Sequence, residues 1–258
     1  MFLTRVYLNP YRRGCRRLVL SPQRLHAAVL ASFPPGVLDS AGEGRVLWRL
    51  DRPVTDLRSS SQASATLSQG PAFSLYISSP VAPDPAGLVE QAGYETQGGV
   101  VVKNYDGFLH KLKAGQDWGF RITVNPVYRR AGQVNSRNRK KILGHITVDQ
   151  QTRWFLDRVE THGFEILKSA QAGGDLPVLE DESGNRFDGE NLVVSLVDRR
   201  LERFSRGSGK EKVQVTLQLA TFQGILRVKN PAALCSALIN GIGRAKGYGA
   251  GLMTLARP

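Results

Sequence analysis

The order in which strand-like and helix-like segments follow one another constrains the fold of this chain more than any other feature of its sequence. Near the start, "FLTRVYLNP" alternates apolar and polar side chains as a strand does, and "SPQRLHAAVLASF" then places apolar residues at helical spacing. Ser21 and Pro22 suit the N-cap and the first turn of that helix. The patterns predict strands at residues 2–10, 45–52, 72–79 and 98–105, and helices at 21–33 and 83–93.

The same order returns in the second half of the chain. One predicted helix begins at a Thr147–Gln150 capping box and ends at Gly163, and another lies between Asn230 as N-cap and Gly241 as C-cap. Two long strand patterns flank "SRGSGK" as an extended hairpin. The predicted strands are 117–126, 164–170, 190–204, 211–228 and 251–256, and the predicted helices are 146–163 and 230–241.

Each half therefore has the order strand, helix, strand, strand, helix, strand, which is that of a ferredoxin-like or RRM-type sandwich. We predict an α+β fold of two tandem ferredoxin-like domains, at residues 1–108 and 117–258. Three segments between the patterned ones are interpreted as loops: the arginine-rich 11–20, the Ser/Gln-rich 58–70 and the basic 127–141.

The charge of the chain indicates the kind of partner. The formal net charge is +13, and no Asp or Glu occurs from Met1 to Leu38 or from Lys212 to Pro258. If these two acid-free ends meet in the fold, they form a positive surface suited to a polyanion, with nucleic acid as the first candidate. A membrane is a poorer candidate, because no basic amphipathic helix with a clean apolar face is evident.

Cysteine and histidine usage excludes several kinds of site. Cys15 and Cys235 are the only cysteines and lie far apart, so neither a disulfide framework nor a zinc ligand set is expected. The four histidines share no metal-ligand spacing, and no metal is expected. Targeting signals are also absent from the sequence pattern. The first residues are too charged for a signal peptide, and no segment approaches the roughly 20 apolar residues of a membrane span. We therefore expect a cytoplasmic protein.

A glycine-rich segment, "NGIGRAKGYGAGLMTLARP", ends the sequence. It lacks the spacing of a P-loop and of a dinucleotide-binding loop, so no nucleotide cofactor is expected. Two interpretations stay open: a turn tightened for packing, or a loop whose N–H groups, with Arg244 and Lys246, lie around RNA or protein backbone. The glycines concerned are Gly241, Gly243, Gly247, Gly249 and Gly251.

Four stretches together resemble a known family: "MFLTRVYLNP", "SPQRLH", "FRITVNPVYRR" and "GIGRAKGYGAGLMTLA". In order and spacing the chain is similar to the CasE-type CRISPR endoribonucleases of type I-E systems. The resemblance implies a metal-independent enzyme that binds the hairpin of a CRISPR repeat transcript, cleaves it at its 3′ base, and stays bound among other Cascade subunits. It also implies that the glycine-rich loop lies beside the RNA and holds no nucleotide cofactor.

The resemblance assigns a catalytic role to His26, in the first predicted helix. Imidazole can exchange protons near neutral pH, as cleavage by attack of a 2′-OH requires. Many relatives carry a tyrosine three residues earlier, where this chain has Gln23, whose amide can position a phosphate or the 2′-OH but cannot donate a proton near neutral pH. A second proton-transfer group would then be a lysine, Tyr11 or water, and slow or absent cleavage is a second hypothesis.

Two basic stretches, at residues 128–141 and 199–212, complete the set of residues predicted to bind RNA. Such stretches are usually solvated faces, but beside the acid-free ends they favour contacts along an RNA helix. In the family a basic hairpin enters the groove of the stem, which points to residues 199–212. The predicted set is Arg24, Arg129, Arg130, Arg137, Arg139, Lys140, Lys141, Arg199, Arg200, Arg203, Arg206, Lys210, Arg244 and Lys246. A general RNA-binding protein is the third hypothesis.

Overall fold

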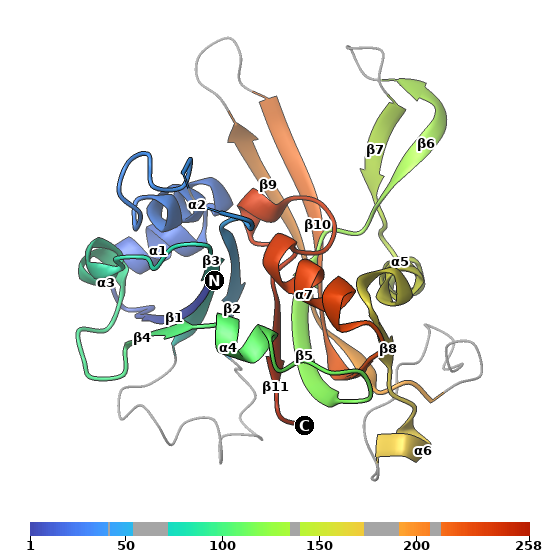
Figure 1. Cartoon of the computed structure of the whole chain (residues 1–258). Coiled ribbons are helices and arrows are strands. Elements are labelled where there is room, and N and C mark those ends of the chain that lie inside the picture. Colours follow the sequence, from blue (N-terminus) through green and yellow to red (C-terminus); the bar gives the residue numbers. More distant parts are fainter. Residues whose placement is uncertain (41, 54–71, 135–139, 173–190, 207–212) are drawn as a thin grey trace. The chain divides into compact units, whose positions relative to one another are not determined.

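The computed structural model describes residues 1–40, 42–53, 72–134, 140–172, 191–206 and 213–258 (Figure 1). It divides into two compact units, one formed by Met1–Gly107 with Gly247–Gly249 and the other by Phe108–Lys246 with Ala250–Pro258. The domain bounds 1–108 and 117–258 stay a prediction, because compactness alone does not show which segments fold independently. The expected loop at 58–70 lies outside the described residues.

The first unit is built on a four-stranded antiparallel sheet of order β2-β3-β1-β4. In chain order its strands are β1 (Phe2–Leu8), β2 (Leu47–Asp51), β3 (Phe73–Ser79) and β4 (Val100–Asn104). Its helices are α1 (Arg13–Val19), α2 (Pro22–Leu30) and α3 (Ala86–Ala92), and the short α4 (Asp106–Leu109) lies at the boundary of the units. This is the predicted βαββαβ order.

Helix α2 begins and packs as its sequence predicts. Ser21 is the N-cap, and its Oγ accepts a hydrogen bond from the N–H of Arg24 at 3.4 Å. Leu25 and Val29, four residues apart, are buried in the core of the unit with side chains of β1 and β3. His26 follows Leu25 and is half-buried, which places it at the edge of this packed face.

The prediction of a loop at residues 11–20 is wrong, because Arg13–Val19 form helix α1. Cys15 and Leu18, three residues apart, are buried and give this helix an inner face. The arginines between them are exposed, and arginine is a good helix former. Because only two apolar residues of this helix are buried and most of the others are arginines, the sequence shows no clear helical period of apolar residues.

The second unit repeats the topology with additions. Its sheet has the order β11-β5-β10-β8, formed by β5 (Asp117–Val124), β8 (Phe164–Ile166), β10 (Val213–Val228) and β11 (Met253–Ala256). Its main helices are α5 (Val148–Val159) and α7 (Pro231–Asn240), and a short helix α6 (Ser169–Ala172) follows β8. The two units together confirm the predicted α+β class with ferredoxin-like topology.

Strand β10 is longer than a ferredoxin-like core needs. It pairs with β8 through Leu226–Val228 and with β9 (Val194–Arg206) through Val213–Gly224, both antiparallel. The predicted hairpin of two long strands is thus present. The predicted strand at 164–170 is shorter, because helix α6 begins at Ser169.

The prediction of a loop at 127–141 is also wrong at residues 127–134 and 140–141, and residues 135–139 lie outside the described ones. Residues Val127–Val134 (β6) and Lys140–Gly144 (β7) pair as a separate antiparallel hairpin. The pair Tyr128 and Leu143 and the pair Arg129 and Ile142 face each other across it. Aromatic and branched residues favour such pairs, and the basic composition of the stretch concealed them.

Helix α5 follows this hairpin and covers an aromatic core. Thr147 accepts from the N–H of Gln150 at 3.2 Å, and Gln150 Oε1 accepts from the N–H of Ile146 at 3.3 Å, so the reciprocal bond is one residue earlier than a capping box has it. Phe155 stacks on Phe222 of β10 with ring centroids 4.8 Å apart. Because Phe155 is held in this core, the opposite face of α5 is turned away from the core.

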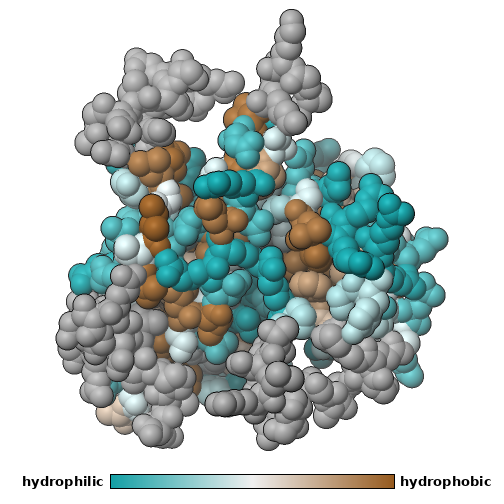
Figure 2. Space-filling view, turned by 180° about the vertical axis from the view of Figure 1, so that it is seen from behind, coloured by the Kyte–Doolittle hydropathy of each residue, from teal (hydrophilic) through white to brown (hydrophobic). Residues whose placement is uncertain are grey.

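The outer surface carries both hydrophobic and hydrophilic residues. Figure 2 shows one face of the molecule, on which hydrophobic residues lie between hydrophilic ones. Exposed apolar side chains spaced in this way are ordinary on a protein surface. None of the helices in the described segments combines the length and apolar character that crossing a bilayer requires.

Candidate functional site

His26 is held by a buried tryptophan of the neighbouring strand. The indole N–H of Trp48, on β2, donates a hydrogen bond to His26 Nδ1 at 3.3 Å, and Trp48 is 3% exposed. A ring nitrogen that accepts a hydrogen bond carries no proton, so the neutral imidazole of His26 has its proton on Nε2. The reactive edge of the ring is therefore Nε2–H.

The surroundings of His26 favour the neutral ring. Burial lowers the pKa of His26, and the nearby positive charge of Arg45 lowers it further. Protonation at Nδ1 would also set a second N–H against the indole N–H of Trp48. Neutral imidazole is the resting form at neutral pH.

The glycine-rich loop packs against this pair of side chains. A Cβ at Gly247 would lie 3.3 Å from His26 Nε2, and a Cβ at Gly249 would lie 2.6 Å from the Trp48 ring. Gly249 also has φ +82°, which side chains with a Cβ rarely adopt. Glycine at these two positions lets the loop lie close to both rings.

The same loop brings a residue that sequence reasoning missed. Tyr248, in the 3₁₀ turn Lys246–Tyr248 (η4), has its ring centroid 6.4 Å from that of His26, with the planes at 60°. Its only signal in the sequence is its place inside the glycine run. Tyr11, the phenol considered from sequence, is 71% exposed and precedes α1.

Gln23 lies on the same side of α2 as His26, since the two are three residues apart. Its side chain is exposed, and the described residues provide its amide with no hydrogen-bond partner. The amide is thus available to a ligand beside the imidazole.

Four arginines gather next to the start of α2. Arg13, Arg16 and Arg17 of α1 and Arg24 of α2 line a shallow cavity of about 440 Å³ together with Leu20 and Ser21. No acid is among these lining residues, so the cavity suits an anion. Sequence reasoning selected only Arg24, because the other three require helix α1 to bring them together.

The arginines predicted to bind RNA on the β9–β10 hairpin differ in their contacts within the protein. Arg199, Arg203 and Arg206 are all exposed, but Arg199 also donates to Gln151 Oε1 at 3.1 Å and to the backbone oxygen of Ile146. The guanidinium of Arg200 lies 3.5 Å from Asp198 and 3.6 Å from Glu202, and its side chain is 15% exposed. Lys210 lies outside the described residues.

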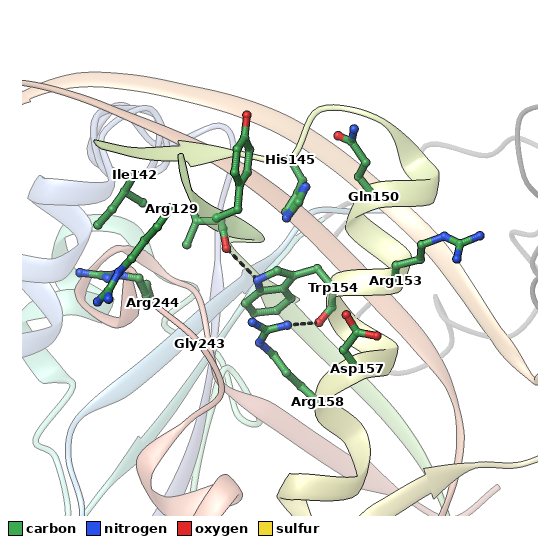
Figure 3. Close-up of a pocket in the computed structure, with 12 residues that line it drawn as sticks. Arg129, Ile142, His145, Gln150, Arg153, Trp154, Asp157, Arg158, Gly243 and Arg244 are labelled. Atoms are coloured by element: carbon green, nitrogen blue, oxygen red, sulfur yellow. Dashed lines mark hydrogen bonds between the residues drawn. The ribbon is translucent and has the colours of Figure 1, made fainter. Parts of the chain in front are cut away.

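The second unit has a larger cavity, of about 720 Å³, between the β6–β7 hairpin, α5 and the glycine-rich loop (Figure 3). Trp154 of α5 lies at its centre, and its indole N–H donates to the backbone oxygen of Val127 at 3.0 Å. The guanidinium of Arg158 lies 3.9 Å from the ring centroid of Trp154 and donates to its backbone oxygen at 2.6 Å. These contacts hold Trp154 and Arg158 as a fixed wall.

Two of the arginines predicted to bind RNA line this cavity. Arg129 and Arg244 are exposed, and within the described part of the chain neither has an acidic partner. A Cβ at Gly243, next to Arg244, would lie 2.8 Å from the Trp154 ring.

The other predicted residues are placed as follows. Gly241 ends α7, and Lys246 begins η4 with its Cγ 3.2 Å from the Cβ position of Gly251. Arg130, Lys140 and Lys141 lie on β6 and β7, with side chains that the structure does not describe, and Arg137 and Arg139 lie outside the described residues. Across the described ranges, His, Cys, Asp and Glu form no group of three that could hold a metal ion.

Comparison with known proteins gives matches over the whole chain. A family model described as "CRISPR associated protein" matches residues 1–257. A curated relative, the CRISPR-associated endoribonuclease Cse3 of Thermus thermophilus, is 26% identical over 256 residues, which are 99% of this chain and 100% of the relative.

Two solved structures share the fold. One is CRISPR endoribonuclease Cse3 bound to a 19-nucleotide RNA, with a TM-score of 0.68, 24% identity, and coverage of 99% of this chain and 100% of that chain. The other is a chain of a CRISPR RNA-guided surveillance complex in its pre-nicking state, with a TM-score of 0.58, 19% identity and full coverage of both chains. At these identities the likeness establishes the fold.

Proposed function

The chain belongs to the CRISPR associated protein family, and from that premise we propose that it is an endoribonuclease of CRISPR repeat RNA. It binds the hairpin of the repeat transcript in the cytoplasm, cleaves at the 3′ base of the hairpin, and keeps the product as one subunit of a Cascade complex. The names of its relatives support this: one is an endoribonuclease, one has RNA bound, and one is part of an RNA-guided surveillance complex.

The observation that carries the proposal is the setting of His26. Its ring is oriented by Trp48, and four arginines without an acid line a cavity at the start of α2, the helix that carries His26. A phosphate bound by such a cluster would hold RNA backbone at the start of the helix that carries a group able to transfer a proton. A positioned acid or base contributes roughly 10²–10⁴-fold to such a reaction.

The proposed reaction is attack of a 2′-OH on the adjacent phosphorus. The 2′-O–P bond forms, the P–O5′ bond breaks, the 2′-OH loses its proton, and the departing 5′-oxygen gains one. The products are a 2′,3′-cyclic phosphate and a 5′-OH. No step requires a metal ion.

The Trp48 hydrogen bond favours one of the two proton transfers for His26. Because Nδ1 accepts from Trp48, the neutral ring has no free lone pair at Nε2 and is a poor base there. The protonated ring, populated as a minor form, is a strong acid at Nε2 and suits protonation of the 5′-oxygen. Gln23 and Tyr248 can orient the 2′-OH or a phosphate oxygen. The proton of the 2′-OH then leaves to water.

The remaining cationic side chains are proposed to hold the RNA stem. Arg203 and Arg206 are exposed on β9, and Arg203 points to the same face as Arg199 by strand alternation. Arg199 and Arg200 are occupied by contacts within the protein, so we expect Arg203 and Arg206 to contribute more to RNA binding.

The test is cleavage of a repeat hairpin under single-turnover conditions in EDTA. His26→Ala is expected to slow cleavage by roughly 10²–10⁴-fold while the Kd for the hairpin changes little. His110→Ala, at an exposed histidine outside the site, is the matched control. Normal cutting by His26→Ala would show that the site assignment is wrong, and a requirement for magnesium would contradict the mechanism.

Gln23 favours a second function, that of a hairpin-binding subunit that no longer cuts. This residue stands where many relatives of the CasE type have tyrosine. Tight, hairpin-specific binding without any product over long incubation would support it. In that case Gln23→Tyr is expected to raise cleavage, if the missing phenol is the cause.

A further inference from the structure

The cavity of the second unit is a hollow that the stacked bases of duplex RNA cannot enter. It is a concavity of about 720 Å³, within the size range of sites that enclose small organic groups, roughly 300–1,000 Å³. The bases of a paired stem are stacked inside the helix, and only its backbone and groove edges reach a protein. A base that is to enter a concavity must be unpaired.

One part of the cavity is aromatic. Tyr128 is 40% exposed, and its ring centroid lies 4.8 Å from that of His145, with the planes at 38°. Burial lowers the pKa of His145 and Arg158 lowers it further, against an opposing hydrogen bond from Gln150. A neutral imidazole beside a phenol ring is a surface on which a base can stack.

Another part of the cavity is cationic. Arg129 and Arg244 both line it, and Figure 3 labels them on one side of the view, with His145 and Trp154 nearer the centre. Asp157 also lines the cavity, but the described residues provide Arg129 and Arg244 with no acidic partner. Two like charges that line one cavity and have no acidic partner are stabilised by an anion such as a phosphate.

We propose that this cavity binds one unpaired nucleotide next to the stem of the bound RNA, with its base on Tyr128 and His145 and its phosphate between Arg129 and Arg244. This inference rests on the proposed function, since it names a subsite for the same RNA. It adds recognition of a single-stranded flank to recognition of the hairpin.

The experiment compares three RNAs: the repeat hairpin alone, the hairpin with a 5′ flank and the hairpin with a 3′ flank. Each carries a 2′-deoxy nucleotide at the cleavage site, so that binding is measured without cutting. For the wild-type protein one flank is expected to lower the Kd by about tenfold, as stacking of a single base on aromatic side chains does. Tyr128→Ala is expected to abolish that gain and to leave the affinity for the bare hairpin within about twofold.

Three further variants separate stacking from general charge. Tyr128→Phe keeps the ring and should keep the gain from the flank. Arg244→Ala should reduce the gain, whereas Lys229→Ala, at a side chain that pairs with Glu165 at 3.3 Å outside the cavity, should leave it unchanged. Thermal melting of each variant checks that it is folded.

The outcomes that overturn the inference are distinct from failure of the proposed function. If neither flank tightens binding, or if Tyr128→Ala weakens all three RNAs equally, the cavity is not a nucleotide site, even where the hairpin is bound and cut. If the bare hairpin is not preferred over an unrelated stem, the proposed function itself fails. A 2-aminopurine placed along the effective flank should lose fluorescence at one position in wild type and keep it in Tyr128→Ala.

Discussion

Removal of the indole N–H of Trp48 is the most direct perturbation of the imidazole of His26, the proposed catalytic group. The N–H donates to His26 Nδ1 at 3.3 Å and stabilises the neutral ring with its proton on Nε2. Trp48→Phe removes the donor, but it also leaves a void, because Trp48 is 3% exposed and the glycine loop packs on its ring. A cleaner replacement is benzothienylalanine at position 48, which keeps the bicyclic shape and lacks the N–H.

The expected size of the effect follows from the bond that is lost. A neutral hydrogen bond contributes about 0.5–1.5 kcal/mol, and this one exists only when Nδ1 is unprotonated. Its loss should therefore raise the ratio of protonated to neutral His26 by about two- to twelvefold at a given pH. The pKa of His26 moves upward from its lowered position, and the tautomer with the proton on Nδ1 becomes accessible.

Two measurements check this expectation. The ¹⁵N chemical shifts of the His26 ring, followed against pH, report both the pKa and the nitrogen that carries the proton. The single-turnover cleavage rate against pH reports the functional consequence: if protonated His26 is the acid, the limb on which the rate falls with rising pH should move to higher pH in the variant.

A definite result would refute the reasoning. If Nε2 of wild-type His26 is unprotonated in the neutral ring, Trp48 does not set the tautomer, and His26 would then be free to act as a base. If the ring titrates identically with and without the indole N–H, the hydrogen bond has no effect on protonation. Equal loss of activity at every pH would indicate a purely structural role for Trp48.

Three other predictions concern the same neighbourhood. Gly247→Ala should slow cleavage with little change in RNA binding, because the added Cβ would lie 3.3 Å from His26 Nε2; single-turnover rates and Kd values separate the two. Tyr248→Phe should slow cleavage by roughly five- to tenfold, the worth of one hydrogen bond, and no change would exclude a role for its hydroxyl. The free energy of unfolding should fall as the pH is lowered from about 7.5 to 5.5, because the unfolded chain, with His26 near its ordinary pKa, binds a proton before the folded chain does. Urea titrations should show this loss, and it should be smaller in His26→Gln.

Sequence predicted the topology of both units because that information is local. The N-caps Ser21, Thr147 and Asn230 each accept a hydrogen bond from the backbone of their own first turn, as expected. Strand alternation and turn residues did the rest. The two segments wrongly predicted as loops, α1 and the β6–β7 hairpin, are both rich in arginine. In each, the many charged residues left too few apolar ones to give a clear helix or strand pattern.

The candidate site could be predicted only in part. Resemblance to a family identifies His26, but in the sequence Trp48 is an ordinary strand residue, 22 positions away. Their contact depends on where α2 lies over the sheet relative to β2, which is the edge strand that pairs with β3 and not with β1, the strand that precedes α2. Such a contact is tertiary, and no local pattern in the sequence encodes it. The cavity of the second unit likewise draws on three separate segments.

Two tryptophans contact the glycine-rich loop, and comparing them distinguishes an effect on packing from an effect on the protonation of His26. Each is buried, each has its indole N–H occupied, and each has a loop glycine against its ring: Gly249 at Trp48 and Gly243 at Trp154. The acceptor of Trp48 is an imidazole that titrates, whereas the acceptor of Trp154 is a backbone oxygen that does not. Loss of the N–H at Trp154 should therefore lower stability and leave the pH dependence of cleavage unchanged, while the same loss at Trp48 should shift it. If both changes alter the pH profile alike, packing of the loop, and not the hydrogen bond to His26, controls the chemistry.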